Sequence, residues 1–339
     1  MSRSTRLIHD DLSQALVELL STIYEGEIEL VDFSRLSGGA NMEIWSMDAV
    51  LDNTSHPIIL RRMPGGKNDL NQVGNIDLAT EAELITIAAG HGVAVPQIVH
   101  VLCPSDALGI GFLMSREPGL ALPKRILKDP DLNKTRELLA FECGKVLAKI
   151  HSIPLEKIPG SVKNMSEIDI NETMQAKLDN YNNVSPVHQL TLNWLRDNLP
   201  AARGKTLVHG DFRNGNMLVD TNGIVAILDW ELAHIGNPVE DLGYLCGNVW
   251  RFGNHDQPVG GFGQYNELLD GYRTEAGWAP TVEEVQHWEI YCAMNWAMAC
   301  LTMLDLYRTR ADTSIERAAV GRRLSESEID LLLLLEGKM

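Results

Sequence analysis

Apolar and polar residues alternate in strand-length segments through the first third of the chain. Apolar residues alternate or cluster in segments 28–36, 42–51 and 57–63, as is typical of half-buried strands. The connections "SGGAN" and "DNTSH" consist of turn-forming residues, so these strands are expected to form an antiparallel meander. Two further strands are predicted in "VAVPQIVHVL" and "GIGFLMSRE". Helical spacing predicts one helix over residues 10–23 and another over about 77–89.

Helical spacing dominates beyond about residue 120. It recurs over segments 131–153, 166–181, 187–198 and most of 261–335, whereas short strands are predicted within 206–230. The pattern therefore predicts an α+β chain with two lobes. The first, residues 1–118, is a small antiparallel sheet with a leading helix, and the second, residues 119–339, is mainly helical. Ligands commonly bind between two such lobes.

Composition narrows the class of protein. The chain has 339 residues, of which 45% are hydrophobic and 22% charged, which is typical of a soluble globular protein. Its 29 basic and 46 acidic residues give a formal net charge of −17, which argues against nucleic-acid binding. A cationic substrate would suit this charge, but an acidic, solvated surface is the simpler explanation and is favoured.

Targeting signals and cysteine pairs are not visible. The five cysteines include no CxxC pair, so neither a disulfide framework nor a zinc site is expected. The N-terminus has no apolar signal region, and the uncharged segment 290–304 is too short to span a bilayer. We expect a cytoplasmic protein without membrane contact.

Candidate chemistry is concentrated in "LVHGDFRNGNMLVD" (207–220) and in the "VAILDW" that follows it. Asn216 and Asp229 offer the oxygen ligands that Mg²⁺ prefers, and Asp211 is placed to accept the proton of an incoming hydroxyl. The spacing matches the protein-kinase catalytic loop, H-R-D-L-x-x-x-N, and the Asp of D-F-G. Arg213 stands where kinases usually carry a lysine that touches the transferred phosphate. The alternative is a hydrogen-bonded turn without chemistry.

The sheet lobe offers candidate phosphate ligands. Gly38, Gly39 and Asn41 lie in the "SGGAN" loop between two predicted strands, where kinases have a phosphate-covering loop. Arg61 ends the third strand, where kinases place a phosphate-binding lysine, and Glu83 on the next helix could pair with it. A Walker A loop is excluded because Arg61 stands where that motif requires glycine.

The segments "LVHGDFRNGN", "VAILDWELAHIGNPVEDLGYL" and "LMSREPG" resemble the aminoglycoside phosphotransferase family, a small-molecule branch of the protein-kinase-like fold. The sequence of these segments is most similar to that of the acyl-CoA-dehydrogenase-linked branch, some of whose members phosphorylate 4-hydroxyacyl-CoA thioesters. The resemblance implies ATP as the phosphoryl donor, Asp211 as the catalytic base and Mg²⁺ bound by Asn216 and Asp229. It also implies that Arg61 and Glu83 form the nucleotide-phosphate pair.

The same resemblance implies two supporting roles and shows two departures. The backbones of Ser115 and Glu117 would bind adenine at the hinge, and Asp241 would brace the catalytic loop from behind. Arginine replaces the usual lysine at position 61, although its fork can hold phosphates through two hydrogen bonds. "DWE" replaces D-F-G, so the glycine that lets kinases swing this segment is missing and Asp229 is expected to stay fixed.

The acceptor is expected to be a small-molecule hydroxyl. The eleven residues 230–240, between Asp229 and Asp241, are too few for the activation segment on which kinases dock a peptide. Five aromatic residues could line the acceptor pocket: Trp230, Tyr244, Trp250, Trp288 and Trp296. A hydroxyacyl-CoA-type metabolite is favoured over an aminoglycoside or other antibiotic. A pseudokinase that binds nucleotide without transfer is a third alternative, and the sequence leaves oligomeric state and the choice between ATP and GTP open.

Overall fold

The computed structural model describes residues 3–36, 42–66, 76–166, 170–181, 185–198 and 202–337. Its five-stranded antiparallel sheet has the strand order β1-β2-β3-β5-β4. The strands are β1 (Glu29–Arg35), β2 (Glu43–Leu51), β3 (Thr54–Arg62), β4 (Ile98–Val101) and β5 (Gly111–Ser115). β2 and β3 form a hairpin whose two turn residues, Asp52 and Asn53, have φ of 48° and 63°. Asp and Asn tolerate this left-handed conformation, which matches the twist of the strands.

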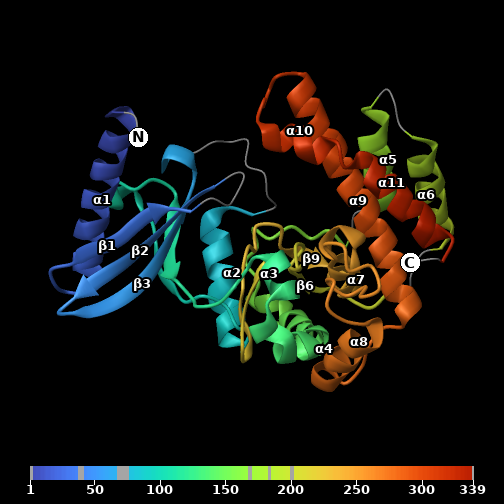
Figure 1. Ribbon diagram of the computed structural model, residues 1–339, viewed down its shortest axis with the longest axis horizontal. Coiled ribbons are helices and arrows are strands. Elements are labelled where there is room, and N and C mark those ends of the chain that lie inside the picture. Colours follow the sequence, from blue (N-terminus) through green and yellow to red (C-terminus); the bar gives the residue numbers. More distant parts are fainter. Residues whose placement is uncertain are drawn as a thin grey trace.

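Two helices pack beside the sheet (Figure 1). α1 (Arg3–Ile23) covers the outer face and buries Leu16 and Leu20 against sheet residues such as Met47, and it begins before the predicted residue 10. α2 (Leu78–Gly90) lies between the sheet and the helical lobe, and its apolar residues belong to the core of that lobe. The side chain of Asp77 caps α2 by accepting the Thr80 N–H at 2.8 Å.

The rest of the chain forms the mainly helical lobe, so the structure confirms the α+β, two-lobed class. Its helices are α3 (Pro123–Lys128), α4 (Asn133–His151), α5 (Ile170–Asp179), α6 (Pro186–Asp197), α7 (Val239–Cys246), α8 (Tyr265–Ala276), α9 (Val282–Arg308), α10 (Ile315–Gly321) and α11 (Leu324–Leu335). Two short antiparallel pairs interrupt them: β6 (Thr206–Val208) with β9 (His234–Gly236), and β7 (Met217–Asp220) with β8 (Gly223–Ile227).

The apolar segment 290–304 lies within α9, which packs against α6, α7, α10 and α11. Within the described ranges, no helix combines the length and the apolar character that a membrane span requires.

Candidate active site

The loop between β6 and β7 carries the predicted catalytic aspartate. β6 ends at Val208 and β7 begins at Met217, so the turn holds Asp211 between two buried strands. Gly210 has φ of 80°, and a Cβ at that position would lie 2.4 Å from the carbonyl oxygen of Leu232. Glycine is therefore required here by both the backbone conformation and the close approach of the next segment.

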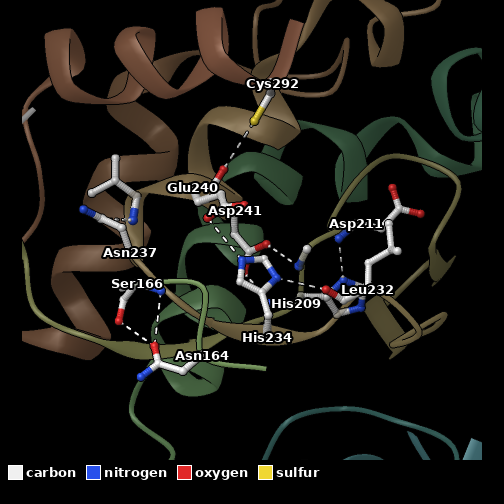
Figure 2. A network of polar contacts seen from close by, with 12 residues as sticks. Asn164, Ser166, His209, Asp211, Leu232, His234, Asn237, Glu240, Asp241 and Cys292 are labelled. Atoms are coloured by element: carbon white, nitrogen blue, oxygen red, sulfur yellow. Dashed lines mark hydrogen bonds and ion pairs between the residues drawn. The ribbon is translucent and has the colours of Figure 1, made fainter. Parts of the chain in front are cut away.

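Asp241, at the start of α7, braces this loop as expected. Its carboxylate accepts the N–H groups of His209 at 2.8 Å and Gly210 at 2.9 Å, and it contacts His151 Nε2 at 3.1 Å. Burial alone would raise the pKa of Asp241, but the bonds and charge of the His151 and His209 contacts hold it below its ordinary value. Figure 2 shows Asp241 next to the backbone at His209.

The Asp211 carboxylate is buried and receives three side-chain donors. Oδ1 accepts the Tyr244 hydroxyl at 2.7 Å and Arg213 Nε at 3.0 Å, and Oδ2 accepts Asn216 Nδ2. The Arg213 guanidinium lies 4.5 Å from the centre of the Trp250 ring. Burial raises the pKa of Asp211, although Arg213 and Tyr244 oppose the shift.

Asn216 and Asp229 present the right donor set for a hard cation. Asn216 Nδ2 is engaged by Asp211, both by its carboxylate and by its carbonyl oxygen at 3.1 Å. The amide oxygen Oδ1 of Asn216 is therefore the atom left to bind a metal. Asp229 follows β8 in a left-handed conformation with φ of 66°, and its side chain is 31% exposed. Two oxygen ligands and room for water fit Mg²⁺, which keeps several waters in protein sites.

Arg61, at the end of β3, joins the sheet to the segment that follows β8. Its guanidinium bonds Glu81 at 3.2 Å, Asp229 at 2.9 Å and Glu231 at 2.8 Å. Glu81, not the predicted Glu83, is thus its partner on α2. Positions two apart on a helix point in nearly opposite directions, and Glu83 is exposed while Glu81 is buried.

Glu231 is a site residue that the sequence reasoning missed. Burial and the neighbouring Asp229 carboxylate raise the pKa of Glu231 to about 7, although Arg61 opposes the shift. The sequence signal for Glu231 is the Glu of "DWE". It replaces the glycine of D-F-G, and it also adds a carboxylate that contacts Arg61. Burial likewise raises the pKa of Glu81, which shares the same guanidinium.

At the predicted hinge, the two adenine-binding candidates differ. The N–H of Ser115 donates to the carbonyl of Gln97 at 2.8 Å, so a nucleotide cannot take it without breaking that bond. The backbone N–H of Glu117 has no protein partner among the described residues, and adenine recognition there stays a prediction. The phosphate-loop candidates Gly38, Gly39 and Asn41 lie outside the described residues.

A cavity of about 650 Å³ opens beside the catalytic loop. Gly210, Leu232, Trp288 and Tyr291 contribute to its wall, and its volume lies in the range of small-molecule sites. The other predicted pocket aromatics lie elsewhere. Trp230 is fully buried in the core, whereas Tyr244, Trp250 and Trp296 line a narrow second cavity on the Arg213 side of the loop.

Comparison with known proteins identifies the family. The model of the phosphotransferase enzyme family matches residues 45–278, which is more than half of the chain. The chain belongs to this family. This phosphotransferase is 26% identical to mouse acyl-CoA dehydrogenase family member 10 over 97% of its own length, but it spans only 31% of the mouse protein.

Solved structures show the same fold. A Ralstonia eutropha protein assigned as an aminoglycoside phosphotransferase aligns with a TM-score of 0.72 and 19% identity, covering 96% of this chain and 98% of that one. The GDP complex of aminoglycoside 2'-phosphotransferase-IIIa aligns with a TM-score of 0.64 and 15% identity, covering 94% and 99%.

In this phosphotransferase, the predicted residues fall into two bonded sets. Asp211, Arg213 and Asn216 contact one another directly, and Arg61 contacts Asp229. The ion pair between Arg61 and Asp229 therefore connects the sheet lobe to the segment that follows β8.

Proposed function

We propose that this phosphotransferase moves the γ-phosphoryl group of ATP to a hydroxyl of a small molecule. The observation that carries the proposal is the convergence of a buried carboxylate, two oxygen ligands and a buried guanidinium. Asp211 contacts Asn216, and Arg61 contacts Asp229 at 2.9 Å. Phosphoryl transfer requires positioning and charge stabilisation rather than covalent chemistry from the protein, and these groups supply both.

In the proposed reaction, Asp211 accepts the proton of the acceptor hydroxyl as the new O–P bond forms. The bond between the γ-phosphorus and its bridging oxygen breaks, and ADP leaves with that electron pair. Arg213 is placed to contact the moving phosphoryl group, and Arg61 to contact the nucleotide phosphates through Nη1, because its Nε and Nη2 bond carboxylates. Mg²⁺, held by Asn216 Oδ1 and Asp229, would neutralise phosphate charge. Glu231 lies near enough to Asp229 to assist it in holding Mg²⁺, since both carboxylates bond the same guanidinium nitrogen of Arg61.

We assign the acceptor to anionic amphiphiles of the hydroxyacyl-CoA type, because of the charges around the 650 Å³ cavity. Lys177 and Lys205 lie on its lining, together with His234 and Glu240. Burial opposes protonation of His234, but Glu240, at 3.2 Å, outweighs it and raises the pKa of His234 to about 9. Among the described residues of the lining, the positive charges of the two lysines and His234 outnumber the negative charge of Glu240 at neutral pH. The apolar wall formed by residues such as Trp288 suits an acyl chain.

An aminoglycoside or other antibiotic is the second candidate acceptor. The net charge of −17 and the fold of the solved neighbours favour it. The positive cavity disfavours a polycation, because like charges would meet there. A pseudokinase is disfavoured because Asp211, Asn216, Asp229 and Arg61 are all present and connected.

Nucleotide binding is tested by thermal unfolding. Saturating Mg·ATP should raise the Tm by about 5 °C, since a ligand at 100 times its Kd adds about 2.7 kcal/mol. Asp229→Ala should remove most of that shift because it loses a metal ligand. Asp197→Ala, an exposed residue on α6, is the matched control and should keep the shift. No shift with Mg·ATP or Mg·GTP would contradict the proposal.

The acceptor is tested by a coupled ADP-release screen with four substrate classes: 4-hydroxyacyl-CoAs, aminoglycosides, choline-like alcohols and homoserine. Activity confined to the acyl-CoA class is expected. Turnover of aminoglycosides alone would support the second candidate, and nucleotide binding without turnover of any class would support the pseudokinase.

A further inference from the structure

The two oxygens of the Asp211 carboxylate are not equivalent. A carboxylate offers about four lone-pair positions, two on each oxygen. Tyr244 and Arg213 fill both positions on Oδ1, and Asn216 fills one on Oδ2. Among the described residues, one position on Oδ2 is left for an acceptor hydroxyl.

The two donors on Oδ1 are themselves held in place. Tyr244 comes from α7, the helix whose Asp241 braces the loop backbone, so one helix fixes both the main chain and the carboxylate. Tyr244 packs against Trp250 with ring centres 5.6 Å apart, and Trp250 stacks on Arg213. The Tyr244 hydroxyl stays protonated and able to donate, because burial and the Asp211 carboxylate hold its pKa well above the ordinary value.

We propose that Tyr244 is a positioning residue of the transfer reaction: by holding Oδ1, its hydroxyl turns Oδ2 of Asp211 toward the acceptor. This inference rests on the proposed function. Tyr244 acts through Asp211, so its loss should lower the rate of transfer and leave nucleotide binding intact. Arg213 cannot replace it, because its Nε already donates to the same oxygen.

Tyr244→Phe tests the proposal, since it removes the hydroxyl and keeps the ring. The assay is ADP release from Mg·ATP, first with water as the acceptor and then with any acceptor from the screen. We expect kcat to fall about 10- to 100-fold, because this is the rate change that corresponds to losing one hydrogen bond to a charged group. KM for ATP should stay unchanged. In an Asp211→Asn background, Tyr244→Phe should have almost no further effect.

Tyr265→Phe is the matched control. Tyr265 is also half-buried and also donates to a buried carboxylate, that of Glu289, but it lies outside the catalytic loop. It should lower the Tm at least as much as Tyr244→Phe and keep the wild-type kcat. Wild-type kcat in Tyr244→Phe, or an equal fall in Tyr265→Phe, would overturn the inference and leave the proposed function standing. No ADP release by the wild-type chain with any acceptor would overturn both.

Discussion

The two proposed halves of the site differ in charge and in how they are built. The donor half consists of Arg61, Glu81, Asn216, Asp229 and Glu231, and its three carboxylates all bond one guanidinium. The acceptor half is the 650 Å³ cavity beside Gly210, with an apolar wall and lysines on its lining. One half is a polar network centred on one guanidinium, and the other is a roomy pocket whose lining mixes apolar side chains with polar and charged ones.

This difference between the two halves indicates where amino-acid substitutions are tolerated. A network in which each buried charge has a partner fails when one member is removed, because the others are left unpaired. A pocket wall of apolar residues can change shape with smaller losses. We therefore expect the donor half to set the reaction and the acceptor half to set the substrate.

Asp211→Asn should have the largest effect, because Asp211 bonds Asn216 of the donor half and directly follows Gly210 of the cavity lining. The amide keeps the shape but cannot accept the hydroxyl proton, so kcat should fall about 1,000-fold. The Tm shift with Mg·ATP should persist, since Asp211 faces the acceptor. The control is Asp220→Asn, at the last residue of β7, whose carboxylate accepts the N–H of Asn222 in a surface turn. Equal loss of nucleotide binding and transfer would show that Asp211 is structural.

Asp241→Asn should affect both halves together. The substitution weakens bonds to two backbone N–H groups and to His151, all of them buried, so unfolding free energy should fall by about 3 kcal/mol. Urea denaturation measures this loss. Asp270→Asn breaks only an exposed pair with Arg273 and should cost less than about 0.5 kcal/mol. Similar values for the two variants would contradict the bracing role.

Asn216 and Asp229 of the donor half were predicted because they lie in short motifs, and their role as metal ligands stays a prediction. Asn216 precedes β7 and Asp229 follows β8, so one hairpin brings them together. The prediction of Glu83 as the partner of Arg61 was wrong for a physical reason. α2 is apolar on most of its surface, so its pattern does not show which side faces Arg61.

The acceptor half was beyond sequence reasoning. Its lining includes residues of α5, α7, α9, β9, the segment 202–205 and the loop between β6 and β7, several of which are far apart in the chain. Helical spacing identified α5 and α9, but it does not determine how the two helices cross or which side chains then share a cavity. No motif in the sequence singles out Lys177 or Lys205; the fold brings both onto the cavity lining to which Gly210 also contributes.

Lys177→Glu and Lys205→Glu should separate the two halves, because each substitution should affect binding of the acceptor and leave binding of ATP unchanged. Each reverses one charge on the cavity lining, so KM for an anionic acceptor should rise about tenfold, while KM for ATP stays unchanged. Lys145→Glu on α4, outside the cavity, is the matched control. A lower KM for an aminoglycoside in the reversed variants would instead favour the cationic acceptor.

Mild acid should destabilise the α6 region, which packs against α5 and α9 behind the acceptor half, with the smallest effect of the series. His188 on α6 is buried, and neither ring nitrogen has a hydrogen-bond partner among the described residues. Burial lowers the pKa of His188, although Glu328 opposes the shift. The unfolded chain therefore binds a proton more readily as pH falls below about 6.5, and stability drops by at most about 1.4 kcal/mol per pH unit. His188→Leu should flatten the dependence of Tm on pH between 7 and 5, whereas the exposed control His255→Leu should not. If His188→Leu keeps the wild-type slope, the acid sensitivity of the α6 region has another origin.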